Sequence, residues 1–395
     1  MSEHLVKAYN SLCTSFTRGD GIYLWDTQGK RYLDALCGIS VTNLGHNYPA
    51  VTEAIQQQAS ILLHTSNIYW IEWQQKLADL ICKLSAMDRV FFCNSGAEAN
   101  EAAIKIARLY SHNQGNSDPH IIVMDHSFHG RTMATLSATG NRKVQAGFEP
   151  LVSGFVRAPY NDIDAIRSIA ANNKKVVAIL VEPVQGEGGI IVPDNGYIEA
   201  LRQICDDNNW LLMLDEVQSG IARSGKMFAF QHSNIIPDVM TLAKALGNGM
   251  PIGACVTQGK AAEVIQPGNH GSTFGGNPLA CRVGCAVLES IEQNKLLDNV
   301  TRTSAQLVSH LKRDLVHHAD FQQIRSMGLL IGIEMKHNYQ AFVAHALEQG
   351  LLVNVTAEKV IRLLPPLILN EQQTEDMAQQ IIACINSFEP ATRIN

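Results

Sequence analysis

The chain has 395 residues, a formal net charge of −6 at pH 7, 46% hydrophobic residues and 17% charged residues. This length is enough for more than one packed unit, and the composition is typical of a globular protein with a large core. The acidic balance and the lack of a basic run argue against nucleic acid as a partner. The first residues lack a basic and apolar leader, and no apolar run approaches membrane-spanning length. A cytoplasmic location without membrane contact is therefore expected.

The chain from Gly21 onward, GIYLWDTQGKRYLDAL, alternates apolar and polar residues on both sides of a turn at 26–29. This pattern predicts a β-hairpin. Farther along, five short apolar runs alternate with helical patterns and predict strands buried on both faces: 90–93, 121–124, 176–181, 210–214 and 239–242. Strands that alternate with helices predict an α/β fold built on a mainly parallel sheet.

The C-terminal part has a different pattern. After about residue 290, a long helical pattern precedes IRSMGLLIGIEM and, later, VIRLLPPLIL, which read as two strand-like runs around a helix. This arrangement predicts a smaller α+β domain. The predicted organisation is an N-terminal segment that packs with the small domain, a large domain and the small domain, at 1–45, 46–288 and 289–395.

Nine cysteines are scattered from Cys13 to Cys384 without a CxxC pair. This usage is typical of reduced thiols in a protein core. Cys281 and Cys285 are spaced to share a helix face, but no histidine or carboxylate cluster accompanies them. Core packing is favoured over metal binding, and no metal is expected.

Polar residues follow each predicted strand, where parallel sheets bind ligands. The first strand runs into NSGAEANEAAIKIARLY, in which Ser95 and Gly96 form a turn and a helix starts at Ala97. The free N–H groups of a helix N-terminus can bind a phosphate, but simple N-capping by Ser95 explains the same residues equally well. Both interpretations stay open.

The second strand ends in DHSFHGRT. Phe128 can stack on a planar ring, and Arg131 can bind a carboxylate through a bidentate pair. No role is assigned to His126 or His129, because structural histidines are commoner than catalytic ones.

Four carboxylates follow the next two strands. EPVQGEGG contains Glu182 and Glu187, which could serve acid–base chemistry but more plausibly pair with nearby cations, most simply arginines. WLLMLDEVQSG delivers Asp215 and Glu216 directly from an apolar run. A carboxylate at such depth must be paired, hydrogen-bonded or protonated, and a cationic partner is expected.

The fifth strand leads to Lys244 in TLAKALGNGMPIGA. Most lysines keep their charge in water, but a buried lysine loses proton affinity and can attack a carbonyl as a neutral amine. A phosphate seat, a stacking ring, a carboxylate and such a lysine are together what pyridoxal 5′-phosphate (PLP) needs.

These segments resemble the class III, fold-type I aminotransferases, and most of all the acetylornithine aminotransferases. The resemblance covers nearly the whole chain. The matching motifs occur in the family's order: GIYLWDTQGKRYLD, NSGAEANEAAIKIAR, FHGRT, EPVQGEGG, DEVQSG, TLAKALG, HGSTFGGNPLAC and VIRLLPPL.

The resemblance implies a role for each cofactor-binding residue. Lys244 would bind PLP covalently and carry the proton between substrate carbon and cofactor, and Asp215 would pair with the pyridinium nitrogen. Gln218, one helical turn from Asp215, would hydrogen-bond the phenolic oxygen. The remaining contacts would come from Phe128 over the ring, from Ser95, Gly96 and Ala97 at the phosphate, and from Thr273 of a neighbouring subunit. The active site would then be complete only in a homodimer.

The resemblance also implies the substrates. The distal amino group of N2-acetylornithine would pass to 2-oxoglutarate, giving N-acetylglutamate 5-semialdehyde and glutamate. Arg131 would bind the far carboxylate of acetylornithine, and Arg362 the α-carboxylate of glutamate. Glu187 would mask Arg362 in the first half-reaction and move aside in the second. Tyr69 and Trp70 would lie near the acyl end.

Four positions depart from the family's pattern. The family commonly has phenylalanine where Tyr69 stands and tyrosine where Trp70 stands, which leaves the acyl specificity open. Ala222 and Asn248 stand where glycine is frequent, and both are interpreted as tolerable backbone variation without effect on the chemistry.

Other functions stay possible. Succinylornithine, succinyl-diaminopimelate, free ornithine and 4-aminobutyrate are alternative donors for the same mechanism. A nicotinamide-dependent dehydrogenase is disfavoured because Gly247, Gly249 and Gly253 miss the GxGxxG spacing. A silent binding protein is disfavoured because the lysine, aspartate and arginine of the site are all present.

Overall fold

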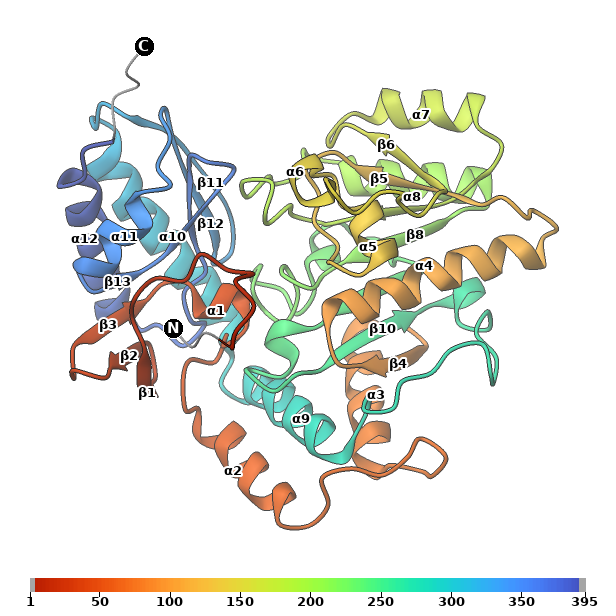
Figure 1. The fold of residues 1–395 in the computed structure, drawn as a ribbon, viewed down its shortest axis with the longest axis horizontal. Helices are drawn as coiled ribbons and strands as arrows, with labels where there is room; N and C mark the ends of the chain where they lie inside the picture. Colours follow the sequence, from red (N-terminus) through yellow and green to blue (C-terminus); the bar gives the residue numbers. More distant parts are fainter. Residues whose placement is uncertain (1–3, 391–395) are drawn as a thin grey trace.

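The computed structural model describes residues 4–390, and its central feature is a seven-stranded sheet (Figure 1). The strand order is β4-β10-β9-β8-β7-β5-β6. The strands are β4 (Arg89–Cys93), β5 (His120–Met124), β6 (Phe155–Ala158), β7 (Val176–Val181), β8 (Leu211–Asp215), β9 (Val239–Leu242) and β10 (Gly253–Thr257). β10 runs antiparallel to both its neighbours, and the other pairs are parallel. The expected α/β class with a mainly parallel sheet is confirmed.

All five predicted strands are present, whereas β6 and β10 are not predicted from the sequence. β6 is the four-residue stretch FVRA, too short and too polar for a clear apolar run. β10 follows directly on the glycine-rich stretch after Lys244, and Gly253 is its first residue. The formation of β6 and β10 therefore depends more on pairing with distant strands than on their local sequence.

Helices cover both faces of this sheet. Alternate residues of β8 separate two buried clusters, since Leu212 and Leu214 belong to one cluster and Leu211 and Met213 to the other. This alternation follows from the two-residue period of a strand. The helices of this part are α2 (Pro49–Ala59), α3 (Glu72–Ser85), α4 (Gly96–Asn113), α5 (Met133–Ala138), α6 (Arg142–Gln145), α7 (Ile163–Asn172), α8 (Tyr197–Asn208) and α9 (Pro278–Gln293), with short 3₁₀ helices η1 (Ala229–His232), η2 (Lys244–Leu246) and η3 (Gly259–Ala261).

Two smaller four-stranded sheets complete the molecule, with the orders β1-β2-β3-β13 and β11-β12-β15-β14. Their strands are β1 (Phe16–Asp20), β2 (Tyr23–Asp26), β3 (Arg31–Asp34), β11 (Phe321–Met327), β12 (Leu330–Met335), β13 (Leu351–Leu352), β14 (Asn354–Thr356) and β15 (Val360–Leu363). The helices around them are α1 (Cys37–Ser40), α10 (Leu296–Leu315), α11 (Phe342–Glu348) and α12 (Glu371–Asn386). The predicted hairpin at 26–29 is present as β2 and β3.

The segment IRSMGLLIGIEM is a hairpin of β11 and β12, not the single strand-like run expected. The chain reverses at Gly328, whose φ is +57°. A side chain there would also collide with the backbone of Ser224, because an added Cβ would lie 2.4 Å from its carbonyl carbon. A glycine inside an apolar run is thus a turn here, which apolarity alone does not reveal.

The N-terminal and C-terminal parts of the chain join in one layer, since β13 pairs in parallel with β3. Arg223 ties these parts to the large sheet. Its guanidinium is fully buried and donates to Ser40 Oγ at 3.1 Å, to the carbonyls of Leu329 at 3.1 Å and Pro365 at 2.5 Å, and to Asn43 Oδ1.

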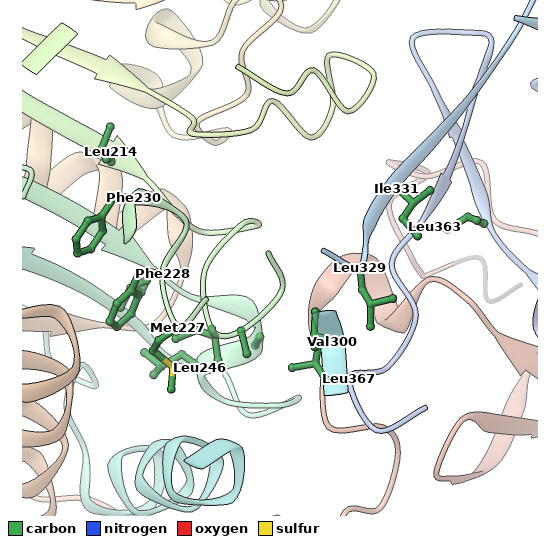
Figure 2. Packing of buried hydrophobic residues seen from close by; sticks show 14 of the residues in the cluster. Leu214, Met227, Phe228, Phe230, Leu246, Val300, Leu329, Ile331, Leu363 and Leu367 are labelled. Atoms are coloured by element: carbon green, nitrogen blue, oxygen red, sulfur yellow. The ribbon is translucent and has the colours of Figure 1, made fainter. Parts of the chain in front are cut away.

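The predicted domain boundaries stay predictions. Helix α9 continues without a break across the boundary predicted at residue 288. One buried cluster contains residues from both parts of the chain. Figure 2 shows Leu214, Phe228 and Phe230 of the large part and Ile331 and Leu363 of the small part among its members.

Candidate active site

The carboxyl ends of β5, β7, β8 and β9 surround a cavity of about 440 Å³. Parallel strands present their carboxyl ends at one edge, so residues far apart in sequence meet there. Nine of the predicted site residues line the cavity: Ser95, Gly96, Ala97, Phe128, Arg131, Glu182, Asp215, Gln218 and Lys244.

Lys244 follows β9 and opens the short helix η2. Its φ of +45° is unusual for a residue with a side chain, and the residue lines the cavity. Burial, and then the charge of Arg362, hold the pKa of its amine below the ordinary value. A larger share of neutral amine at neutral pH is what a nucleophilic lysine requires.

Asp215 is the last residue of β8, and its carboxylate is buried. Oδ2 accepts a hydrogen bond from Asn100 Nδ2 at 2.8 Å and lies 2.8 Å from His129 Nδ1, while Oδ1 accepts the Val217 N–H at 3.1 Å. The expected cationic partner is therefore not a lysine or arginine. Asparagine, histidine and backbone nitrogens contact its two oxygens instead.

Three residues of this network are missed from the sequence: Asn100, His129 and Thr241. Asn100 lies on α4 among Ala99, Ala102 and Ala103, all buried. A polar residue on an otherwise apolar helix face was the available signal, because a buried amide needs partners. His129 gives no comparable signal.

The phosphate seat and the N-cap interpretations of Ser95 both find support. Its hydroxyl accepts the Glu98 N–H at 3.2 Å and also lies 2.9 Å from Glu98 Oε2, so the side chain caps α4. The first-turn N–H groups of Gly96 and Ala97 stay at the cavity wall. Gly96 is needed there, because an added Cβ would lie 2.7 Å from Val217 Cγ1.

Phe128 and Arg131 form the outer wall of the cavity. The guanidinium carbon of Arg131 lies 5.7 Å from the centre of the Phe128 ring, and the Arg131 side chain is exposed. It makes no ion pair within the described part of the chain. An arginine in this state can bind a carboxylate from solution.

Glu182 does not pair with an arginine, contrary to expectation. Its buried carboxyl accepts the Phe128 N–H at 3.3 Å. Burial first, and then the charge of Asp215, raise the pKa of Glu182 well above its ordinary value.

Glu216 likewise has no cationic partner within residues 4–390. It accepts the N–H groups of Ala229 at 2.6 Å and Phe230 at 2.8 Å. Burial raises its pKa to about 7.

Glu187 does pair with an arginine, as expected. Its Oε1 lies 2.6 Å from Nη1 of Arg362, which is fully buried on β15 and also contacts Gln218 Oε1 at 3.2 Å and Asn354 Oδ1 at 3.0 Å. Burial alone would raise the pKa of Glu187, but the charge and hydrogen bond of Arg362 hold it below its ordinary value. Nη2 of Arg362 is buried without a partner.

The pair lies beside a second cavity of about 700 Å³, which shares Phe128 and Arg131 with the first. Arg142 and Lys143 line its outer side, and Lys143 bonds Glu358 at 2.6 Å across the two parts of the chain. An elongated anionic molecule could thus extend from Lys244 past Arg131 into this space.

Five predicted residues do not line the first cavity: Glu187 and Arg362, which lie beside the second cavity, and Tyr69, Trp70 and Thr273, which lie at the surface. Tyr69 and Trp70 are 67% and 88% exposed. Thr273 lies in a separate surface hollow with His64 and Asn67. Gln218 does line the cavity, but residues 217–222 form turns and not the expected helical turn.

Two of the four departures from the family's pattern lie where the backbone conformation favours glycine. Ala222 and Asn248 have φ of +67° and +44°, the region that glycine favours. The amide of Asn248 accepts the Leu44 N–H at 2.8 Å and donates to the Gly45 carbonyl at 3.1 Å. This asparagine therefore ties the segment after Lys244 to the N-terminal part.

A buried lysine with a lowered pKa and a buried carboxylate that accepts N–H donors meet at this edge of the sheet, as expected for a PLP enzyme. The chain belongs to the class-III aminotransferase family, whose model matches residues 6–385. An acetylornithine aminotransferase of Nitrosomonas europaea is 55% identical to it over 385 residues, 98% of both chains. Another, of Methanocaldococcus jannaschii, is 47% identical over 371 residues, 94% of this chain and 93% of its own.

Solved structures agree over the same length. The ornithine aminotransferase of Toxoplasma gondii ME49 superposes with a TM-score of 0.93 at 32% identity, covering 97% of this chain and 92% of its own. The acetylornithine aminotransferase of Elizabethkingia anophelis superposes with a TM-score of 0.87 at 34% identity, covering 98% of this chain and 97% of its own.

The family works with PLP, and the T. gondii enzyme has been described with partial occupancy of PLP at its active site. The residues of this cavity fit that cofactor. Lys244 can meet the aldehyde, the N-terminus of α4 the phosphate, and Asp215 the ring nitrogen. No group of three or more His, Cys, Asp or Glu that could hold a metal occurs within residues 4–390, and no helix there is long and apolar enough to cross a membrane.

Proposed function

We propose that the chain transfers the distal amino group of N2-acetylornithine to 2-oxoglutarate, giving N-acetylglutamate 5-semialdehyde and glutamate. The observation that carries the proposal is the Glu187–Arg362 ion pair beside Lys244. An arginine that can be masked or freed lets one site accept an ω-amine and then an α-amino acid. The names of the relatives at 45–55% identity support acetylornithine as the donor.

Each residue of the first cavity has a task in this reaction. When bound, PLP supplies an aldehyde and an electron-withdrawing ring that stabilises charge on the substrate carbon. Lys244 binds it and later moves the proton of the substrate carbon, and Asp215 keeps a proton at the ring nitrogen. Gly96 and Ala97 bind the phosphate through their N–H groups, and Phe128 shields the ring from water.

The substrates are sorted by charge. Arg131, exposed between the two cavities, binds the carboxylate of acetylornithine while Glu187 neutralises Arg362. In the second half-reaction Glu187 moves aside, and Arg362 binds the α-carboxylate of glutamate as it forms from 2-oxoglutarate. The exposed fraction of the Glu187 side chain, 37%, leaves it room to move.

The site is completed by a second copy of the chain. Large apolar side chains lie exposed in the segment around Tyr69 and near Thr273: Ile61, Leu62, Leu63, Ile68, Tyr69, Trp70 and Phe274. A homodimer would cover this surface, bring Thr273 to the partner's phosphate, and place Tyr69 and Trp70 near the acyl end. Light scattering should give the mass of a dimer, and a monomer that is fully active would contradict the proposal.

The cytoplasmic location stays a prediction.

The donor is tested by single-turnover spectra of the PLP-loaded protein. N2-acetylornithine, succinylornithine, ornithine, succinyl-diaminopimelate and 4-aminobutyrate are mixed with it separately. The visible band of the protein-bound cofactor should decay fastest with acetylornithine. Equal or faster decay with another amine would keep the mechanism and replace the donor.

A further inference from the structure

We infer that Asn100 and Thr241 are positioning residues that hold Asp215 in place for the ring nitrogen of the cofactor. The inference rests on the proposed function, because it assigns Asp215 to that nitrogen. Asn100 comes from α4 and lines the first cavity, whereas Thr241 comes from β9 and lines neither cavity. Both are buried, at 1% and 0% exposure.

Thr241, Asn100 and Asp215 are connected by a series of hydrogen bonds in which each residue donates to the next. Thr241 Oγ1 donates to Asn100 Oδ1 at 2.8 Å, and Asn100 Nδ2 donates to Asp215 Oδ2 at 2.8 Å and to the His129 carbonyl at 2.8 Å. The side-chain amide of Asn100 has only one favourable orientation in this network. If it were rotated, its oxygen would face the carboxylate of Asp215 and the carbonyl of His129, which are both acceptors.

Thr241 therefore completes the series of hydrogen bonds. Its hydroxyl satisfies the amide oxygen of Asn100, which is turned away from Asp215 and has no other hydrogen-bond partner among the described residues. A methyl group in its place would leave that oxygen buried and unpaired, which favours rotation or displacement of the amide. The effect of Thr241 on Asp215 is thus transmitted through Asn100.

These hydrogen bonds also distinguish Asp215 from Glu182, the other buried carboxyl group described above. Asp215 receives side-chain and backbone N–H donors on both oxygens, which fix the orientation of its carboxylate, whereas Glu182 receives backbone donors only. Burial, and then the charge of Asp215, raise the pKa of Glu182. Asp215 is therefore the carboxyl whose position is fixed by side chains of α4 and β9.

His129 has a different part in the same cluster. Its Nδ1 faces Asp215, and its Nε2 is buried with no partner. The ring can therefore contact Asp215 through Nδ1 alone. Asn100 supplies the side-chain amide donor to Asp215, beside the backbone N–H of Val217.

The experiment compares four variants, T241V, T241S, N100D and T303V. Valine replaces the threonine hydroxyl by a methyl group of similar size, and serine restores the hydroxyl. N100D replaces the donor by a carboxyl group directly facing Asp215. T303V is the matched control, because Thr303 is also fully buried and its hydroxyl bonds a backbone carbonyl at 2.8 Å, in α10.

Two readouts are used apart from activity: the dissociation constant of PLP from the apoprotein, and the ¹⁵N NMR shift of ring-labelled PLP in the protein. T241V should weaken PLP binding about 3- to 10-fold, the effect of one lost hydrogen bond between neutral groups, here passed on through Asn100, and move the shift toward the unprotonated ring. N100D should do more, by about 100-fold. T241S and T303V should stay within twofold of the parent.

Unchanged PLP affinity and unchanged ¹⁵N shift in both T241V and N100D would overturn the inference. A loss in T303V equal to that in T241V would do the same, since it would mark a general effect of stability. Failure of the proposed donor would appear separately, as a slow reaction of the parent protein with acetylornithine at a normal ¹⁵N shift.

Discussion

At the scale of single residues, the site depends on how each charge is treated by its surroundings. Burial lowers the pKa of Lys244 and raises that of Glu182, and the contact with Arg362 lowers that of Glu187. Deprotonation of Lys244, protonation of Glu182 and ionisation of Glu187 are thereby each made easier than for the same group in water. Composition cannot show this, because each shift depends on distance and burial.

Replacement of Lys244 by alanine should abolish covalent attachment of PLP. In the parent protein, borohydride reduction followed by peptide mapping should find the cofactor on Lys244. The variant should show no modified peptide, and its turnover should fall by at least 10²- to 10⁴-fold because the proton carrier is lost. A reduced adduct on K244A with PLP alone would contradict the assignment.

Replacement of Glu187 by alanine should free Arg362 in both half-reactions. The rate with glutamate relative to acetylornithine is expected to rise about tenfold, since a masking carboxylate no longer competes for the guanidinium. The measurement is the half-reaction rate with each amino donor, with E292A, which removes an exposed carboxylate of α9 away from both cavities, as the control. An unchanged ratio would exclude the masking role.

At the scale of elements, the strand β12 carries the strongest charge cluster away from the catalytic residues. Glu334 bonds Arg325 and lies 2.6 Å from Lys359, and Arg325 also donates to the carbonyls of Gly189 at 2.7 Å and Ile190 at 3.0 Å. The cluster thus connects the sheet that bears Arg362 with the loop that bears Glu187. Burial opposes the charge on Glu334, but its hydrogen bonds to Lys359 and Arg325 lower its pKa to about 2.

E334Q should therefore lower stability in a pH-dependent way. The folded pKa of Glu334 lies below its unfolded value, so its stabilising effect is complete above about pH 4.5 and is lost as the pH falls toward 2. We expect a loss of about 1–2 kcal/mol at pH 7 and convergence with the parent at acidic pH. The measurement is urea unfolding as a function of pH, and a constant difference would contradict it.

At the scale of the whole molecule, the fold has to hold Arg362, which comes from the small part, against a cavity built by the large one. Arg223 is the buried connection, with four hydrogen-bonded groups from three stretches of chain. Burial lowers its pKa to about 10, so the guanidinium remains charged at neutral pH. It forms no ion pair within residues 4–390.

R223A should destabilise the folded chain by at least about 3 kcal/mol, because several buried acceptors lose their donor and a cavity is left. Thermal and urea unfolding measure the loss. R313A, which removes an exposed arginine, should change stability by no more than about 0.5 kcal/mol. Equal losses of unfolding free energy in R223A and R313A would show that the buried hydrogen bonds of Arg223 do not stabilise the fold.

Much of this protein could be predicted from its sequence. Five strands of the large sheet and the N-terminal hairpin follow from local periodicity, and the residue types after those strands indicate the chemistry of PLP. Local sequence patterns did not predict β6 and β10, which form by pairing with distant strands. They also did not predict the turn at Gly328, because it lies inside a continuous apolar run.

The sequence by itself determined the class of fold and the residue types that meet the cofactor, because periodicity and motif chemistry are local properties. Only the tertiary structure decided which charges meet. Glu187 and Arg362 are 175 residues apart in the chain, Asn100 and Asp215 are 115 apart, and Asn100 and Thr241 are 141 apart. Their contacts arise where helix α4, the loop after β7 and the small sheet that carries β15 meet the carboxyl edge of the large sheet. Burial and charge there lower the pKa of Lys244 and raise that of Glu182.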